Sequence, residues 1–260
     1  LWRSSSQWIG GLFFLFFLII IFSNKSFNYK MTNLTYSGES NYKSEENIKN
    51  NLLKIFIFYS ILSLIYFTLL NISGVRLFNS LNLTMTLVSN GGFLPSDSLN
   101  DIIISNFQKI ILIFALIFSM LNFYFLFNIF NRRALFKSHK EDFYLITFAT
   151  FFVLLIYFND FEALDIIISV LSSLTNSGIT LLETNNNLSL YFLLLTIVGG
   201  SLISNTSGIK LSRFYILLKI TAAEIIKLIS PNSVINKTIF NSENKINEDY
   251  VKISFLIFIS

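Results

Sequence analysis

The chain of 260 residues contains no cysteine, two prolines and a single histidine. The absence of cysteine excludes a disulfide framework, a thiolate metal site and a cysteine nucleophile. The one histidine, His139, lies among arginines and lysines, which is typical of a solvated side chain. Charged residues make up only 13% of the chain. Because no nucleophile, base or metal-ligand cluster stands out, the sequence argues against an enzyme.

Apolar and aromatic residues dominate instead: 53% of the chain is hydrophobic, with 30 phenylalanines. This composition predicts an all-α polytopic membrane protein, since a bilayer span needs about 20 apolar residues. The candidate spans are Ile9–Phe22, Leu52–Leu70, Ile110–Phe130, Phe143–Phe158 and Leu188–Ile203, and a sixth begins near Val251.

Lysine and arginine gather in alternate connecting segments. The segments 23–51 and 131–142 and the stretch after residue 203 are basic, whereas the segments between them carry few positive charges. Cytoplasmic loops carry the excess of these residues, so the basic segments are predicted to face the cytoplasm and the N-terminus the outside. The net charge of +4 is therefore an orientation signal, and no nucleic-acid partner is predicted. The outer segments hold acids that form either a cation-attracting vestibule or scattered solvated charges: Asp97, Asp101, Asp160, Glu162, Asp165 and Glu183.

Two polar turns occur at matching places between spans. The first turn reads Ser89-Asn90-Gly91-Gly92-Phe93 and the second reads Thr175-Asn176-Ser177-Gly178-Ile179. Both have Asn in second place, Gly in fourth and a large apolar residue in fifth. Each follows an apolar segment, 78–88 or 165–174, that is too short to cross a core about 30 Å thick.

This repeat predicts re-entrant pore loops, in which a half-helix enters from outside and ends inside the membrane. The partial negative charge at the C-terminus of such a helix favours a cation, and the carbonyls of the turn can replace the water around it. The alternative is a pair of ordinary outer loops with short surface helices.

A third polar segment reads Ser204-Asn205-Thr206-Ser207-Gly208-Ile209-Lys210 and lies on the basic side. It follows a full apolar run, which predicts irregular backbone within or at the inner end of a span. Such a segment could plug or gate a pathway from the cytoplasmic side. Lys210 is either a snorkelling inner anchor, the favoured interpretation, or a charge that faces the pathway.

Together these motifs resemble the Trk/Ktr/HKT superfamily of potassium transporters, nearest its TrkH-type members. The segment from Trp2 to Gly11 resembles the start of the first outgoing pore helix, and the two turns resemble the second and third selectivity-filter loops. The segment from Val198 to Arg213 resembles the glycine-rich intramembrane loop, and Leu228 to Asn232 resembles the linker before the fourth repeat.

The resemblance implies one pore built from four repeats of span, half-helix and span. The chain would hold the end of repeat one (1–22), a cytoplasmic linker (23–51), repeat two (52–130), a cytoplasmic loop (131–142), repeat three (143–228), and a linker with the start of repeat four (229–260). It is thus expected to be a fragment without the first and fourth filter loops, unable to form a selective pore alone. Ile203 and Ser207 stand where the family's loop usually has Gly, which predicts a stiffer loop. Asn90 and Asn176 stand where Thr is common, which leaves the ion selectivity open.

The function that the resemblance implies is potassium uptake across the bacterial cytoplasmic (inner) membrane. K⁺ would be held by backbone carbonyls of both turns and released past a gating loop formed by Ser204, Asn205, Thr206, Ser207, Gly208 and Lys210. No covalent cofactor is expected. The implied partners are a second copy, forming a homodimer, and a cytoplasmic nucleotide-binding regulatory subunit. The alternatives are a sodium-permeable or sodium-coupled relative and a non-transporting membrane scaffold, which the lost loop glycines favour slightly.

Overall fold

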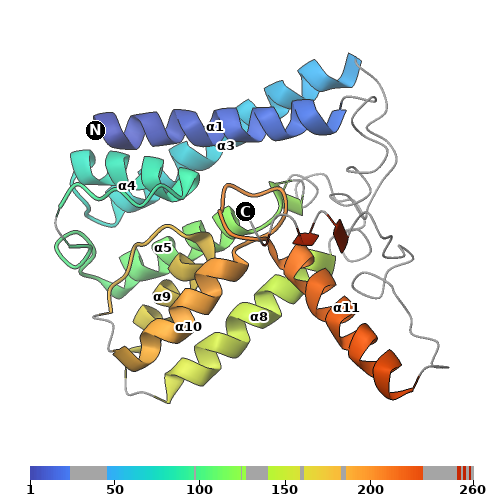
Figure 1. Ribbon diagram of the computed structural model, residues 1–260. Helices are drawn as coiled ribbons and strands as arrows, with labels where there is room; N and C mark the ends of the chain where they lie inside the picture. The colour runs from blue at the N-terminus through green and yellow to red at the C-terminus, as the bar shows by residue number, and fades with distance from the viewer. Residues whose placement is uncertain are drawn as a thin grey trace.

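The computed structural model describes residues 1–23, 46–96, 98–123, 125–126, 140–158, 161–182 and 186–230, and five positions between 251 and 258. All regular elements of these parts are helices (Figure 1). In chain order they are α1 (Trp2–Ser23), α3 (Glu46–Ile72), α4 (Leu77–Ser89), α5 (Asn106–Met120), α8 (Lys140–Tyr157), α9 (Ala163–Thr175), α10 (Asn186–Val198) and α11 (Leu211–Ile229).

Several sequence predictions lie largely or wholly outside the described residues. They are the linker 23–51, the loop 131–142 with His139, the segment 229–260 with most of the sixth span, and the acids Asp97, Asp160 and Glu183.

The helices occur in two sets of the same order. A long helix, a 13-residue helix and a third helix follow one another as α3, α4 and α5, and again as α8, α9 and α10. Helix α1 packs against α3 and α4, and α5 joins the two sets by packing against α9 (Figure 1). The 13-residue helices are about 20 Å long, which is shorter than a membrane core.

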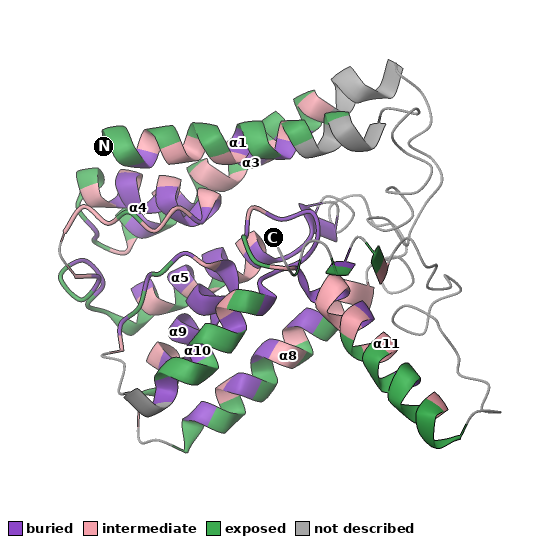
Figure 2. Cartoon of the chain, in the orientation of Figure 1, coloured by how far each residue is buried: buried purple, intermediate pink, exposed green. Residues whose placement is uncertain are grey.

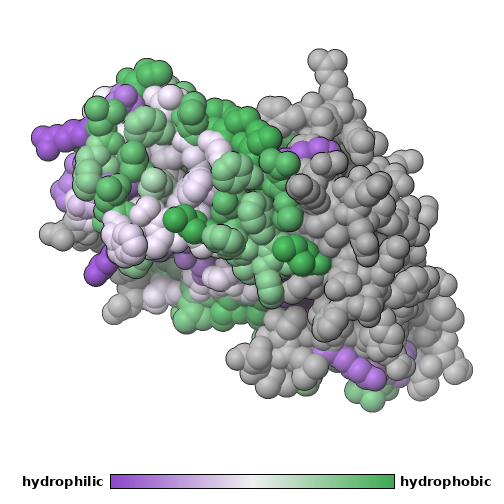
Figure 3. Space-filling model, turned by 90° about the horizontal axis from the view of Figure 1, so that it is seen from above, coloured by the Kyte–Doolittle hydropathy of each residue, from purple (hydrophilic) through white to green (hydrophobic). Residues whose placement is uncertain are grey.

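The outer surface of α1 and α3 is apolar. Phe13, Phe17, Ile61 and Leu64 are each at least half exposed, and Figure 3 shows hydrophobic side chains over much of the described surface on this side. A large apolar surface of this kind suits contact with lipid. Among the described residues, Leu52–Ile72 is the segment long and apolar enough to cross a membrane, and Asn106–Met120, Ala163–Thr175 and Leu188–Val198 are shorter apolar helices.

Two predicted spans are shorter than the sequence suggests. The predicted span 110–130 breaks where α5 ends at Met120, because Leu121 is extended, and helix resumes at Phe123. The predicted span 188–203 ends at Val198. Helix α5 also begins earlier, at Asn106, because Ser105 and Gln108 form a reciprocal capping box.

Helix α9 and the part of α4 after its first turn lie largely inside the protein (Figure 2). Nine of the 13 residues of α9 and seven of the 13 residues of α4 are buried. Several of their buried hydroxyls, including those of Ser80, Thr84 and Ser173, donate to carbonyls one turn earlier in the same helix. This burial does not fit the alternative of surface helices in ordinary outer loops.

Candidate functional site

Both polar turns begin with the same helix cap. Asn90 has φ 56° and ψ 34°, and Asn176 has φ 56° and ψ 26°, so both are left-handed. The amide of Gly91 donates to the Thr86 carbonyl at 3.0 Å, and that of Ser177 donates to the Ser172 carbonyl at 3.1 Å. These bonds close a Schellman-type motif, and Asn is the side chain other than Gly that adopts this conformation most readily.

The cap explains the shared Asn, a role that the sequence analysis did not assign. The available signal was an Asn directly after a short apolar helix and close to a Gly, which is a recognised pattern for a helix end.

The two turns touch each other. Gly92 has φ 78°, and a Cβ atom added to it would lie 2.1 Å from the carbonyl oxygen of Ser177. No side chain fits between these two backbones without displacing one of them. The structure therefore brings the residues 89–93 and 175–179 together, although more than 80 positions separate them in the sequence.

The first turn is held by side chains from two helices. Gln7 of α1 donates its amide to the Gly91 carbonyl, and Thr86 of α4 donates its hydroxyl to the Phe93 carbonyl at 2.7 Å. The guanidinium of Arg3 lies 5.4 Å from the centre of the Phe93 ring, within the range of a cation–π interaction. The backbone of this turn is thus fixed from α1 as well as from its own half-helix.

The second turn is held mainly by its own hydroxyls. The Ser177 hydroxyl lies 3.1 Å from those of both Ser172 and Thr175. Ile179 is buried, and the amide of Asn176 donates to the Thr196 carbonyl of α10 at 3.0 Å. Gly178 has φ 68° and an exposed Cα.

Residues 199–210, here called the 199–210 loop, leave α10 and return to its end before α11 begins. The amides of Ile209 and Lys210 donate to the carbonyls of Ile197 and Val198 at 3.0 and 2.9 Å. Gly199 and Gly208 lie back to back at this crossing, where a Cβ atom on Gly208 would be 2.9 Å from the Gly199 Cα atom. The irregular segment predicted at 204–210 is therefore part of a loop that starts at Gly199 and closes back on the end of α10.

Lys210 is buried inside this loop, with 7% of its surface exposed. Its ammonium group donates to the carbonyl and the hydroxyl of Thr206 and lies 3.4 Å from the Ser204 hydroxyl. The favoured interpretation of Lys210 as a snorkelling anchor is therefore wrong. Hydroxyls and a carbonyl of the loop accept hydrogen bonds from its ammonium group and so keep the charge inside the protein. Hydropathy does not reveal such an arrangement.

The loop takes its shape without glycine at Ile203 and Ser207. The described non-glycine residues with positive φ are Asn90, Asn176 and Lys210. Ile203 and Ser207 thus adopt dihedral angles that any residue tolerates. Of the other predicted gating residues, Ser204 donates to the Ser201 carbonyl at 2.6 Å, and Ser207 is exposed.

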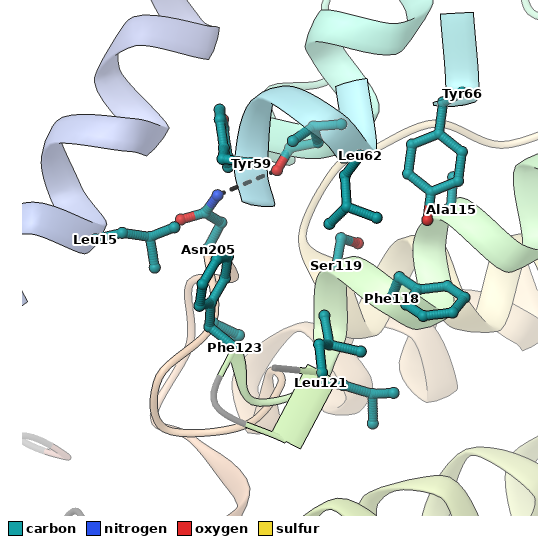
Figure 4. Close-up of a pocket in the computed structure, with 13 residues that line it drawn as sticks. Leu15, Tyr59, Leu62, Tyr66, Ala115, Phe118, Ser119, Leu121, Phe123 and Asn205 are labelled. Atoms are coloured by element: carbon teal, nitrogen blue, oxygen red, sulfur yellow. Dashed lines mark hydrogen bonds between the residues drawn. The ribbon is translucent and has the colours of Figure 1, made fainter. Parts of the chain in front are cut away.

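The 199–210 loop reaches the end of α4. The amide of Asn205 donates to the Val88 carbonyl at 3.1 Å. Asn205 also borders a cavity of about 30 Å³ between α1, α3, α5 and the loop, which is large enough to hold water. Figure 4 shows Asn205 beside Leu15 of α1, with Tyr59 and Tyr66 of α3 and Ser119 of α5 around the same space.

The same loop is bonded to the break after α5. The Ser201 amide donates to the Met120 carbonyl at 3.0 Å, and the Phe123 amide donates to the Ile203 carbonyl at 2.8 Å. The carboxylate of Asp142, in the first turn of α8, accepts a hydrogen bond from the backbone N–H of Asn122 at 2.8 Å. The neighbouring Glu141 accepts the Ser212 amide at the start of α11, at 3.3 Å.

Two of the outer acids form ion pairs. The Lys109 ammonium lies 2.9 Å from Glu162 and 2.6 Å from Asp165, which joins α5 to the start of α9. Asp101 is exposed. Lys109 therefore neutralises part of the acidic group from which the sequence suggested a vestibule.

No family model matches the chain. Similar proteins are found by comparison with known sequences and solved structures, among them the following two. A protein described as an uncharacterized cation transporter of Methanocaldococcus jannaschii is 27% identical over 241 residues, which are 90% of this chain and 49% of that protein. The crystal structure of the potassium transporter TrkH from Vibrio parahaemolyticus is similar with a TM-score of 0.79 and 17% identity, over 97% of this chain and 53% of TrkH. The chain thus spans about half the length of the relatives that it matches.

Both relatives are transporters by their descriptions, in agreement with the prediction that the chain is not an enzyme. The order of long helix, half-helix and helix also agrees with the predicted all-α architecture of repeated units. The chain therefore has the fold of TrkH, in agreement with the all-α architecture that the resemblance of its motifs to the Trk/Ktr/HKT superfamily predicts.

Proposed function

We propose that the chain forms two of four quarters of a pathway for monovalent cations, and that the intact protein takes up potassium. The observation that carries this proposal is the contact between Gly92 and Ser177. It places side by side two turns that each follow the C-terminus of a buried half-helix.

The chemistry of the turns favours a monovalent ion. Residues 89–93 and 175–179 contain amides, hydroxyls and backbone carbonyls but no carboxylate. Neutral oxygens can replace the hydration shell of an ion such as K⁺, whereas Ca²⁺ sites in proteins usually include carboxylates. The two helix C-termini add about half a negative charge each.

The 199–210 loop is the proposed gate. It is bonded to the first half-helix through Asn205 and Val88, and the second turn is bonded through Asn176 and Thr196 to the helix that leads into the loop. A change in the position of the loop would therefore act on the end of α4 and on the last turn of α10. Its residues 204–210 would regulate passage from the cytoplasmic side.

The relatives support cation transport as the general function, and the finer assignments are part of the proposal. The rest of the protein would supply the other two quarters of the filter. Residence in a bacterial cytoplasmic membrane, a homodimeric assembly and a cytoplasmic nucleotide-binding regulatory subunit are proposed from the family resemblance. K⁺ enters this proposal as the transported ion.

Rescue of a potassium-uptake-deficient bacterium by the full-length gene tests the proposal. We expect growth at low potassium with the natural gene. A Gly92→Val variant should not support growth, because its side chain would overlap the Ser177 carbonyl. Absence of growth despite confirmed expression of the natural protein would contradict potassium uptake.

Flux measurements on the purified full-length protein in liposomes separate the alternatives. Potassium flux that exceeds sodium flux supports the proposal. Equal or larger sodium flux, or potassium flux that depends on sodium, would identify the sodium-permeable or sodium-coupled alternative. No cation flux under any imposed gradient would identify a non-transporting scaffold.

A further inference from the structure

We propose that Gln7 is a positioning residue that sets the ion selectivity of the first turn. The inference rests on the proposed function and deepens it. Gln7 belongs to α1, the helix that precedes both described half-helices, yet its amide donates to the Gly91 carbonyl, 84 positions away. Its amide carbon and both terminal atoms occupy the space that a Cβ atom on Gly91 would need.

The contact acts on one of the carbonyls that would otherwise be available to an ion. Gln7 engages the Gly91 carbonyl, and Thr86 engages the Phe93 carbonyl two residues further along the turn. A carbonyl that accepts a protein hydrogen bond is fixed in direction, and its negative end is partly compensated. Because selectivity depends on the number and field strength of the carbonyls around an ion, removal of Gln7 changes both.

The two turns differ in this respect. The second turn is braced by the hydroxyls of Ser172, Thr175 and Ser177, all from its own repeat. In the first turn, the Phe93 carbonyl accepts from Thr86 of its own repeat, whereas the Gly91 carbonyl accepts from Gln7 of α1. The geometry of the first turn therefore depends on the neighbouring repeat, and Gln7 is the residue that transmits this dependence.

A substitution at Gly91 provides a second, independent way to remove the same hydrogen bond. A Cβ atom at this position would lie 1.9 Å from one terminal atom of Gln7 and 2.6 Å from the other. The backbone of Gly91 does not have positive φ, so alanine is tolerated there by the main chain. Gly91→Ala should therefore act by displacing the Gln7 amide.

The experiment measures potassium and sodium flux through the full-length protein in liposomes. Four variants are compared with the natural protein: Gln7→Ala, Gly91→Ala, the double variant with both changes, and Gln108→Leu. Gln108 is the matched control because it is the only other glutamine, and its side chain also donates to a carbonyl, that of Ser73, away from both turns.

We expect Gln7→Ala to lower the potassium-to-sodium flux ratio roughly fivefold, the usual effect of one hydrogen bond. Gly91→Ala and the double variant should give the same ratio as Gln7→Ala, because all three remove the same bond. Gln108→Leu should lower the thermal stability of the protein and leave the ratio unchanged. An unchanged potassium-to-sodium flux ratio in Gln7→Ala would overturn the assignment. So would a double variant whose flux ratio is lower than that of either single variant.

The natural protein distinguishes a failure of this inference from a failure of the proposed function. If it carries no cation flux, the proposed function fails and the assignment of Gln7 fails with it. If it conducts potassium selectively and Gln7→Ala changes stability alone, the proposed function stands, and Gln7 is a packing residue.

Discussion

The Asn205 amide donates to the Val88 carbonyl at 3.1 Å and so bonds the 199–210 loop of one repeat to the half-helix of the other. Val88 lies in the last turn of α4, directly before the first polar turn. The loop proposed as a gate and the turn proposed as a filter are therefore connected through a single side chain.

Replacement of Asn205 by leucine should release the 199–210 loop from the end of α4, because it removes the hydrogen bond to the Val88 carbonyl. Loss of one hydrogen bond of about 1 kcal/mol shifts a two-state equilibrium roughly fivefold. We therefore expect potassium flux through the full-length protein to rise severalfold, as measured in liposomes. Thr68→Ala, an exposed change on α3 outside the loop and both turns, is the control and should leave the flux unchanged. Unchanged flux in Asn205→Leu would argue against a gating role for this contact.

Gly92→Ala should strongly reduce potassium transport. The added methyl group would lie 2.1 Å from the Ser177 carbonyl oxygen, so one turn has to move. We expect at least a tenfold loss of potassium flux in liposomes. Gly74→Ala is the matched control, because Gly74 also has positive φ, but its added Cβ would meet no atom within 4 Å. Similar losses in both variants would show that backbone strain alone is responsible.

Lys210 should tolerate glycine better than alanine. Both changes remove the buried ammonium group, but alanine keeps the cost of a backbone with positive φ and extended ψ, which is about 1–3 kcal/mol for a residue with a Cβ atom. The φ angle of Lys210 is 78°. Thermal unfolding of the purified full-length protein in detergent should therefore give a higher midpoint for Lys210→Gly than for Lys210→Ala. The reverse order would mean that the loop changes its backbone conformation when the lysine is removed.

Asp142 should be replaceable by asparagine but not by leucine. Its carboxylate accepts the Asn122 amide at the break after α5, and asparagine retains an oxygen that can accept this bond. Leucine leaves that buried amide without an acceptor, at a cost of about 1–3 kcal/mol. Thermal unfolding in detergent measures the difference. Equal midpoints for the two variants would indicate that the Asn122 amide finds another acceptor.

The repeat in the sequence predicted the half-helices and the turns that follow them. Local signals suffice for this, because a short apolar segment followed by an Asn and a Gly specifies a helix that stops. The contact between Gly92 and Ser177 was not predictable in the same way. It depends on how α5 and α9 pack, and no pairing of distant residues is visible in one sequence.

The break at Leu121 illustrates a different limit. Residues 110–120 and 123–126 are almost all apolar, so hydropathy presents them as one span. The interruption becomes stable only because Ser201 and Ile203 supply backbone partners and Asp142 accepts the Asn122 amide. The start of α5 could be predicted from the sequence, since Ser105 and Gln108 have the spacing of a capping box.

The unequal support of the two turns has a consequence for biosynthesis. The second turn is completed by hydroxyls within six residues of one another, so it can form as soon as its own repeat has folded. The first turn is also hydrogen-bonded to Gln7 of α1, which precedes it in the chain. Since a chain emerges from the ribosome with its N-terminal parts first, α1 is already available when the first turn is made. Because of the order of the repeats in the polypeptide, the residues that hold each turn are synthesised before that turn or together with it.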